Sequence, residues 1–207
     1  MIKRILVVII MLGSFNVSAQ YDDWSTGEIY LKDSTTLKGL VRFPYIQKDM
    51  PFSGKEKLRY KTERNKPSKK IAAKDIDKVF LNITYSKKVK GKRIKKEREA
   101  IFISISRNKK NSKFGFAELV IDGSVKLVRR AVFNSSGQRM ETLTESLFVR
   151  DDDMAIPFNY AELKSFKKRA KAYFEDCPEL VCKIENETFK RKDLVEIAAF
   201  YNSNCNK

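Results

Sequence analysis

Alternation of apolar and polar residues with a period of two runs through much of the chain before residue 157 and stops there. Ile101, Ile103 and Ile105, for example, alternate with Phe102 and Ser104. Such alternation is typical of a β-strand with one buried face, and no helix-length periodic segment interrupts it. We therefore expect an α+β protein with a mainly antiparallel β domain of about 7–8 strands, folded as a roll, a sandwich or a small barrel.

Turn signals divide this domain into its expected strands. We predict strands in a hairpin over residues 29–43, at 58–61, on both sides of residues 90–92 and at 145–150. Residues 75–81 fit either a strand or a helical turn. The pair Asp122 and Gly123 predicts a two-residue type I′ turn, which needs a positive φ at both positions.

The period changes after Pro157. Apolar residues then recur at spacings of three and four, which indicates an amphipathic helix: Tyr160, Leu163, Phe166, Ala170, Tyr173 and Phe174. Asn159 is a suitable N-cap for this helix, and Pro178 is expected to end it. A last helix is predicted from about Lys190. The β domain is therefore expected to be followed by a C-terminal helical hairpin.

The N-terminus has the layout of a secretory signal peptide. Lys3 and Arg4 precede an apolar run over residues 5–12, and Val17-Ser18-Ala19 offers small residues for cleavage before Gln20. The run is far shorter than the roughly 20 residues that a membrane-spanning helix needs. We expect residues 1–19 to be a signal peptide, 20–157 the β domain and 158–207 the helical tail. Cleavage near Ala19 would place the protein in the periplasm or at the cell surface.

The positive charge is concentrated in one part of the chain. The net charge is +17, and residues 55–113 hold 22 basic and 6 acidic side chains, a net charge of +16. Within this segment the stretch SKKVKGKRIKKERE, residues 86–99, is the densest. A localised field of this kind attracts polyanions and raises their encounter rate.

The candidate binding residues lie in that stretch: Lys87, Lys88, Lys90, Lys92, Arg93, Lys95, Lys96 and Arg98. They could contact phosphate or sulfate groups of lipopolysaccharide, nucleic acid or an acidic glycan. Tyr85 is the one aromatic residue close to them, so stacking of nucleic-acid bases has little support. The alternative is a solvated hairpin whose lysines keep a sheet edge from aggregating.

The chain has no histidine, which excludes serine–histidine and cysteine–histidine triads and histidine metal ligands. Asp75 and Asp77 are a candidate pair for acid–base work, and a carboxylate-dependent hydrolase is the third alternative. The acidic run of residues 151–153 lacks the pattern of a calcium loop. We expect no catalytic residues, no metal and no cofactor. The leading expectation is a non-enzymatic envelope protein with a binding or structural role, whose partner is an envelope polyanion or another envelope protein.

All three cysteines lie in the tail. Cys177 follows Phe174 by three residues and Cys205 follows Tyr201 by four, so each extends the apolar stripe of its predicted helix. A disulfide between Cys177 and Cys205 is favoured in an oxidising compartment, and Cys182–Cys205 is the rival pairing. The third thiol, expected at Cys182, would be a buried apolar residue or form an intermolecular disulfide.

The two ends of the chain, GEIYLKDSTTLKGLVRF near the N-terminus and DCPEL…KIENETFKRKDLVEIAAFYNSNC at the C-terminus, resemble a family of secreted envelope proteins of Bacteroidetes-type bacteria. In that family an opening hairpin follows the signal peptide, and a helical tail carries D-C-P and Y-N with a nearby cysteine. Asp33-Ser34-Thr35 here replaces the glycine-containing turn of the family's hairpin. The resemblance implies an envelope location and carries no assigned reaction.

Overall fold

The computed structural model describes residues 24–43, 56–89, 92–136, 139–151, 153–158 and 165–205. Within these ranges, residues 85–89, 93, 95, 131–136 and 139–143 are described by their backbone alone. The predicted N-cap Asn159 and the signal segment 1–19 lie outside the described residues. No helix of the described part is long and apolar enough to cross a membrane.

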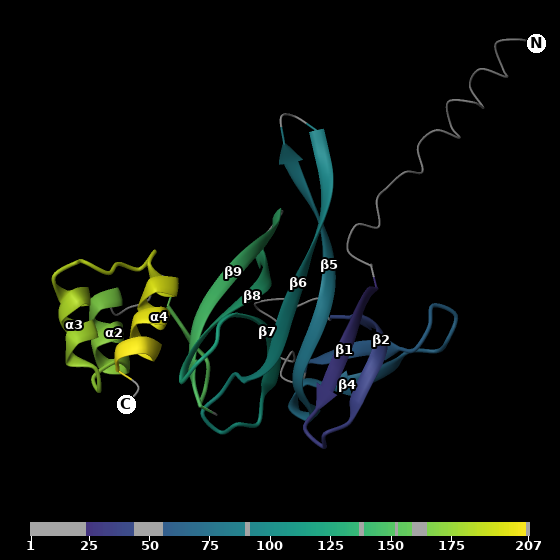
Figure 1. Ribbon diagram of the computed structural model, residues 1–207, viewed down its shortest axis with the longest axis horizontal. Coiled ribbons are helices and arrows are strands. Elements are labelled where there is room, and N and C mark those ends of the chain that lie inside the picture. Colours follow the sequence, from purple (N-terminus) through teal and green to yellow (C-terminus); the bar gives the residue numbers. More distant parts are fainter. Residues whose placement is uncertain are drawn as a thin grey trace, which may run out of the picture.

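In the described part of the chain, ten strands form one sheet in the order β10-β9-β8-β7-β6-β5-β1-β2-β3-β4, and neighbours pair antiparallel at each step (Figure 1). The strands are β1 Ser25–Leu31, β2 Thr36–Arg42, β3 Lys57–Lys61, β4 Lys69–Ala72, β5 Ile76–Val89, β6 Lys92–Ser106, β7 Phe114–Ile121, β8 Val125–Ser136, β9 Arg139–Arg150 and β10 Ile156–Pro157. The α+β class with a mainly antiparallel domain is confirmed.

The prediction of about 7–8 strands is too low. The strands that it missed are the shortest ones, β4 with the sequence KKIA and the two-residue β10. Neither is long enough to show an alternation, and neighbouring strands supply their pairing. In the ambiguous segment 75–81, Asp75 ends the 3₁₀ turn η1 Ala73–Asp75, and the remaining residues belong to strand β5.

The predicted opening hairpin is present, with Ile29 opposite Leu37 and both strands contributing to one core. Its turn places Ser34 at φ 69°. Asp33 stabilises this turn, because its carboxylate Oδ1 accepts a hydrogen bond from the Thr35 backbone N–H at 2.9 Å. The turn can therefore form without the glycine found in the resembling family.

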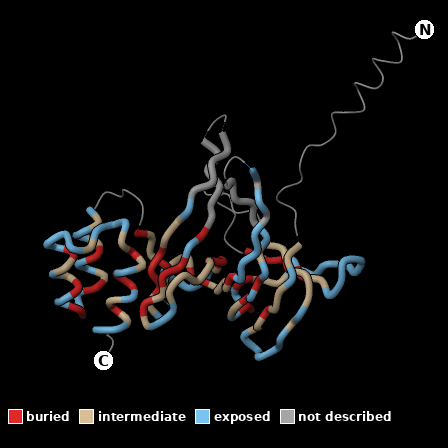
Figure 2. The backbone as a smooth tube through the Cα atoms, turned by 45° about the horizontal axis from the view of Figure 1, so that its top comes forward, coloured by how far each residue is buried: buried red, intermediate tan, exposed pale blue. Residues whose placement is uncertain are grey.

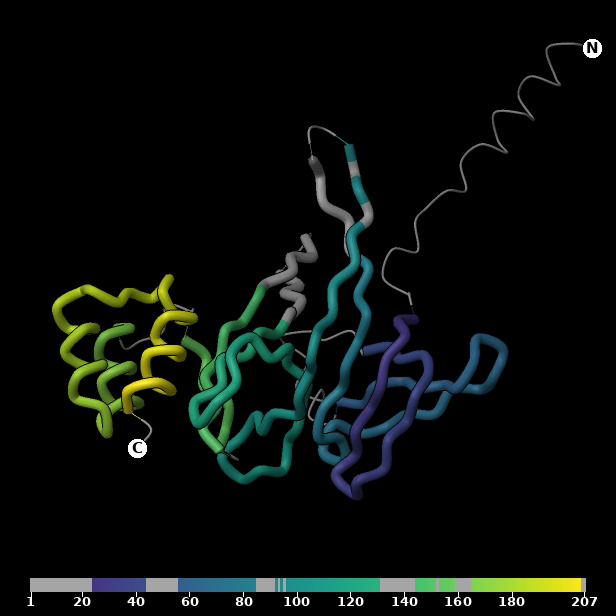
Figure 3. The backbone as a smooth tube through the Cα atoms, viewed as in Figure 1, coloured from purple at the N-terminus to yellow at the C-terminus, as the bar shows by residue number. Residues whose placement is uncertain are grey.

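The N-terminal half of the sheet curls back on itself (Figure 3). Phe43, just after β2, packs its ring against Phe102 of β6 and Phe116 of β7, with ring centroids 4.5 and 5.0 Å apart. A core then forms from the inward residues of β1, β2, β3, β5 and β7: Ile29, Val41, Leu58, Tyr60, Ile76, Val79, Leu81 and Phe116. This curl brings the start of β3 against β7 and β8, far away in the sequence.

The described part of the tail, residues 165–205, holds three helices rather than the expected hairpin of two, and the prediction was wrong on this point. They are α2 Phe166–Tyr173, α3 Pro178–Glu185 and α4 Leu194–Asn204. Pro178 separates α2 from α3 and is also the first residue of α3, where its missing N–H costs nothing. The last helix begins at Leu194 instead of near Lys190, because the Asp193 carboxylate accepts a bond from the Lys190 backbone N–H and closes a turn there.

The tail helices share one core with the sheet. Buried residues of the helices, among them Phe174, Leu180 and Ile197, pack with Leu127 of β8 and Phe148 of β9. Figure 2 shows buried positions on the helices as well as on the strands. The helices therefore stabilise the sheet and do not form a separate appendage.

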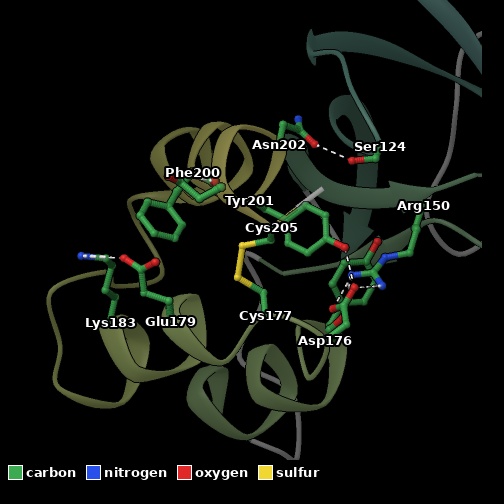
Figure 4. The surroundings of a disulfide bond; sticks show 12 residues. Ser124, Arg150, Asp176, Cys177, Glu179, Lys183, Phe200, Tyr201, Asn202 and Cys205 are labelled. Carbon is green, nitrogen blue, oxygen red and sulfur yellow. Dashed lines mark hydrogen bonds and ion pairs between the residues drawn. A yellow bond between two sulfur atoms is a disulfide. The ribbon is translucent and has the colours of Figure 1, made fainter. Parts of the chain in front are cut away.

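A disulfide joins Cys177, the residue before α3, to Cys205, the residue after α4 (Figure 4). The favoured pairing is confirmed. Cys182 is a free thiol, as expected, but it is exposed, so its expectation as a buried apolar residue was wrong. It lies in α3 near the buried Leu180 and Ile184 but on the helix's solvent side.

The side chain of Asn202 in α4 connects the tail to the β7–β8 turn through hydrogen bonds. Its Oδ1 accepts hydrogen bonds from the Val125 N–H at 2.9 Å and the Ser124 hydroxyl at 3.1 Å. Its Nδ2 donates to the carbonyl oxygens of Asp122 and Val125. The turn is a three-residue connection rather than the predicted two-residue type I′ turn, and of its residues only Gly123, at φ 141°, has a positive φ. Tertiary contact with α4 thus overrides the local turn preference.

Candidate functional site

Strands β5 and β6 continue as a two-stranded ribbon after their outer neighbours end. On one side β1 pairs with β5 only as far as Leu81, and on the other side β7 pairs with β6 only from Phe102 onward. Eight further pairs, from Asn82↔Glu99 to Val89↔Lys92, join β5 and β6 to each other alone. At about 3.3 Å per residue this β5–β6 ribbon, residues 82–99, extends roughly 26 Å. Figure 1 shows it rising above the rest of the sheet.

The ribbon is strongly basic, since residues 82–99 contain eight lysines and arginines and two glutamates. Opposite residues of an antiparallel pair belong to the same face, so the register divides these positions into two sets. The apolar-basic set comprises Ile83, Tyr85, Lys87, Val89, Lys92, Ile94, Lys96 and Arg98. The polar set comprises Asn82, Thr84, Ser86, Lys88, Arg93, Lys95, Glu97 and Glu99. Both acidic residues fall in the polar set.

The apolar-basic set continues the face that is buried at the base of the ribbon. The next pair toward the sheet is Leu81↔Ala100, and both residues are 5% exposed. Farther out this face loses its cover, and Ile94 is 45% exposed. Because aliphatic and cationic residues alternate on this exposed face of the ribbon, it presents apolar surface and positive charge together.

The structure describes the side chains of only some of the predicted binding residues. Lys92 and Lys96 are described and exposed. Arg98 is also exposed, but its guanidinium forms a bidentate salt bridge with the Glu118 carboxylate of β7. Lys87, Lys88, Arg93 and Lys95 lie on described backbone, while their side chains are outside the described part. Lys90 lies outside the described residues altogether.

A second basic site, which the sequence did not reveal, lies where the β3–β4 hairpin meets η1 and the β6–β7 loop. A cleft of about 650 Å³ opens there, lined by Glu56, Lys57, Lys70, Ile71, Ala72, Ala73, Lys74, Asp75, Asn111, Ser112 and Phe114. Ligand-binding pockets commonly have volumes of about 300–1,000 Å³. We refer to it as the lysine-lined cleft.

Glu56 is the most buried charged residue of this cleft's lining and is held by two arginines. Its Oε1 accepts from Arg130 of β8 at 2.6 Å and from Arg107 at 2.9 Å, and its Oε2 accepts from the Phe116 backbone N–H at 3.0 Å. The Arg130 side chain is 2% exposed and that of Glu56 is 5% exposed. Burial and the neighbouring Arg130 lower the pKa of Arg107. The cluster joins β3 to β7 and β8.

Gly115 of β7 leaves room for this cluster. A Cβ at that position would lie 2.7 Å from Arg130 Nη1 and 2.8 Å from Glu56 Oε1. Such distances are well below ordinary contact, so a larger residue would displace the ion pairs. Glu56 is 51 residues from Arg107 and 74 residues from Arg130 in the sequence, and only the curl of the sheet brings it to them.

Two acidic residues line the lysine-lined cleft, which is the feature that a carboxylate-dependent hydrolase would require. The Glu56 carboxylate, however, is already engaged by two guanidinium groups and one backbone N–H. Asp75 is exposed beside Lys74, and Asp77 does not line the cleft. Across the described residues, no cluster of three or more acidic or cysteine side chains is arranged to hold a metal ion.

Comparison with known proteins adds no functional assignment, because neither a family model, nor a curated protein, nor a solved structure matches the chain.

Proposed function

We propose that the chain is a non-enzymatic binding protein of the bacterial envelope, and that it attaches to a phosphate-bearing polyanion through the β5–β6 ribbon. The supporting observation is the ribbon itself: eight residue pairs of β5 and β6 with no third strand paired to them among the described residues, and eight basic and two acidic residues over 82–99. A projecting ribbon can approach an extended surface from several sides, and its charge would raise the rate of encounter with a polyanion.

The register of the ribbon favours an amphiphilic polyanion, and lipopolysaccharide is the one that we propose. Its phosphate groups suit the lysines, and its acyl chains suit the aliphatic positions between them. Ile94, which is 45% exposed among basic neighbours, is the described residue that best represents this combination. Nucleic acid or an acidic glycan would use the charges but would gain little from the apolar positions.

The test is binding of residues 20–207 to purified lipopolysaccharide, heparin and double-stranded DNA at 50 and 300 mM salt. We expect the tightest binding to lipopolysaccharide, a steep fall with salt, and at least tenfold weaker binding when Lys87, Lys88, Lys92, Lys95 and Lys96 are changed to Gln. A matched variant with Lys66, Lys109, Lys110, Lys126 and Lys192 changed to Gln removes the same charge elsewhere. Equal losses in the two variants would show that net charge, and not the ribbon, determines binding.

The substitution Ile94→Ser separates lipopolysaccharide from the other polyanions. We expect it to weaken lipopolysaccharide binding several-fold and to leave heparin and DNA binding unchanged, because it removes exposed apolar surface and no charge. An unchanged lipopolysaccharide affinity, or tighter binding to heparin or DNA, would identify a polyanion without acyl chains as the ligand class.

A further inference from the structure

The lysine-lined cleft has the features of a binding site that is separate from the ribbon. It lies by η1, at the residues that precede β5, whereas the ribbon is formed by the far end of β5. Its residues come from the β3–β4 hairpin, η1 and the loop before β7. An inference about the cleft therefore does not depend on what the ribbon binds.

The charges of the cleft favour an anion. Three exposed lysines line it, Lys57, Lys70 and Lys74. Of the two carboxylates, that of Glu56 is compensated by Arg107 and Arg130, which leaves the exposed Asp75 as the opposing charge. Lys32 adds a further cation nearby, with its Nζ 5.4 Å from the centroid of the Phe114 ring. Because arginines compensate the charge of Glu56, this carboxylate does not repel a negative ligand in the cleft.

The uncharged part of the lining narrows the class of anion. The partly exposed Ile71, Ala72 and Phe114 contribute apolar surface. Asn111 and Ser112 contribute an amide and a hydroxyl group, whose oxygens accept hydrogen bonds from Ser106 and Asn108. A lone inorganic anion would occupy a small part of about 650 Å³ and would use none of the apolar surface. A sugar has both apolar C–H faces and hydroxyl groups, and a phosphate group on the sugar would meet the lysines.

We propose that the lysine-lined cleft binds a phosphomonoester carried on a sugar. The same chemical group occurs in free sugar phosphates and in the phosphorylated sugars of envelope glycolipids, and the experiment distinguishes these two sources. Lys57, Lys70 and Lys74 bind the phosphate, and the residues around Phe114 and Asn111 contact the sugar.

The experiment is titration calorimetry of residues 20–207 with four probes: glucose 6-phosphate, glucose, inorganic phosphate, and a monophosphorylated glucosamine disaccharide without acyl chains. We expect one of the two sugar phosphates to bind at least tenfold more tightly than inorganic phosphate, and glucose not to bind. Tighter binding of glucose 6-phosphate identifies a free sugar phosphate as the source, and tighter binding of the disaccharide identifies a glycolipid.

The variant Lys57→Gln/Lys70→Gln/Lys74→Gln is expected to lose at least tenfold in affinity for the preferred sugar phosphate. Because all three side chains are exposed, its thermal unfolding should match that of the unsubstituted chain. The matched control is Lys66→Gln/Lys126→Gln/Lys192→Gln, which should bind as the unsubstituted chain does. The inference is overturned if neither sugar phosphate binds, if inorganic phosphate binds equally tightly, or if the two triple variants lose the same affinity.

Discussion

Single residues at the contact between sheet and tail determine how closely the two can pack. A Cβ at Gly123 would lie 2.4 Å from Asn202 Nδ2, and Gly123 also has a φ of 141° that other residues rarely adopt. We expect Gly123→Ala to reduce the free energy of unfolding by about 1–3 kcal/mol, measured by urea titration. The same substitution should cost less in an Asn202→Ala background, where the steric part is removed. Equal costs in both backgrounds would assign the whole effect to backbone strain.

The ion pair between Glu56 and Arg130 is a second contact at the scale of residues. Replacing Glu56 with Gln leaves the almost fully buried Arg130 guanidinium without its closest carboxylate, so we expect a loss of about 3–5 kcal/mol in the free energy of unfolding. The double variant Glu56→Gln/Arg130→Met removes both charges and should recover part of that loss. Thermal and urea unfolding measure both variants, and a double variant less stable than Glu56→Gln would contradict this explanation.

Elements with strong local signals could be predicted from the sequence, while those that depend on distant contacts could not. The β1–β2 hairpin, the strands on both sides of residues 90–92 and the Cys177–Cys205 pair follow from alternation and helical spacing. Helix α3 was missed because Pro178 ends one helix and begins the next. The lysine-lined cleft was missed because its residues, from Glu56 to Phe114, meet only through the curl of the sheet.

At the scale of elements, the disulfide holds the ends of α3 and α4 together. Cys177 and Cys205 are 28 residues apart, and closing a loop of that length contributes about 3–4 kcal/mol in the chain-entropy model. We expect Cys177→Ala/Cys205→Ala to lose a similar amount in urea unfolding. Cys182→Ser, which changes an exposed free thiol, should leave the stability unchanged and serves as the control. Comparable losses in both variants would contradict the assigned pairing.

Asp176 links β9 to α4, and we expect this link to depend on pH. Its carboxylate accepts from the Tyr201 hydroxyl at 2.5 Å and from Arg150 Nη1 at 2.9 Å. Burial tends to raise the pKa of Asp176, but the bonds from Tyr201 and Arg150 outweigh burial and hold it below its ordinary value of 3.8. A carboxylate with a lowered pKa stabilises the folded state above its unfolded pKa, and this contribution disappears as the pH falls through the folded pKa.

Asp176→Asn tests this pH dependence. Because the Asp176 side chain is 44% exposed, solvent screens the interaction and we expect a loss below about 1 kcal/mol at pH 7. Urea unfolding from pH 7 to pH 3 should show the difference between the two proteins shrinking below about pH 4. A difference that stays constant over this range would mean that Asp176 acts through packing and not through its charge.

Across the whole molecule, the excess positive charge lies on the β domain and not on the tail. Residues 55–113 carry a net charge of +16, and in the fold they supply both the β5–β6 ribbon and most of the lysine-lined cleft. The tail helices and the disulfide stabilise the opposite end of the sheet. We propose that the ribbon is a binding element added to a sheet that is stable without it.

The most direct measurement of that claim is a ribbon-deletion variant in which residues 84–97 are replaced by Asn-Gly. This two-residue turn would join Ile83 to Arg98, which are paired in the intact chain. We predict an unfolding temperature within a few degrees of that of the intact chain, together with at least a hundredfold loss of lipopolysaccharide affinity. Retained affinity, or a sheet that no longer folds, would contradict the account.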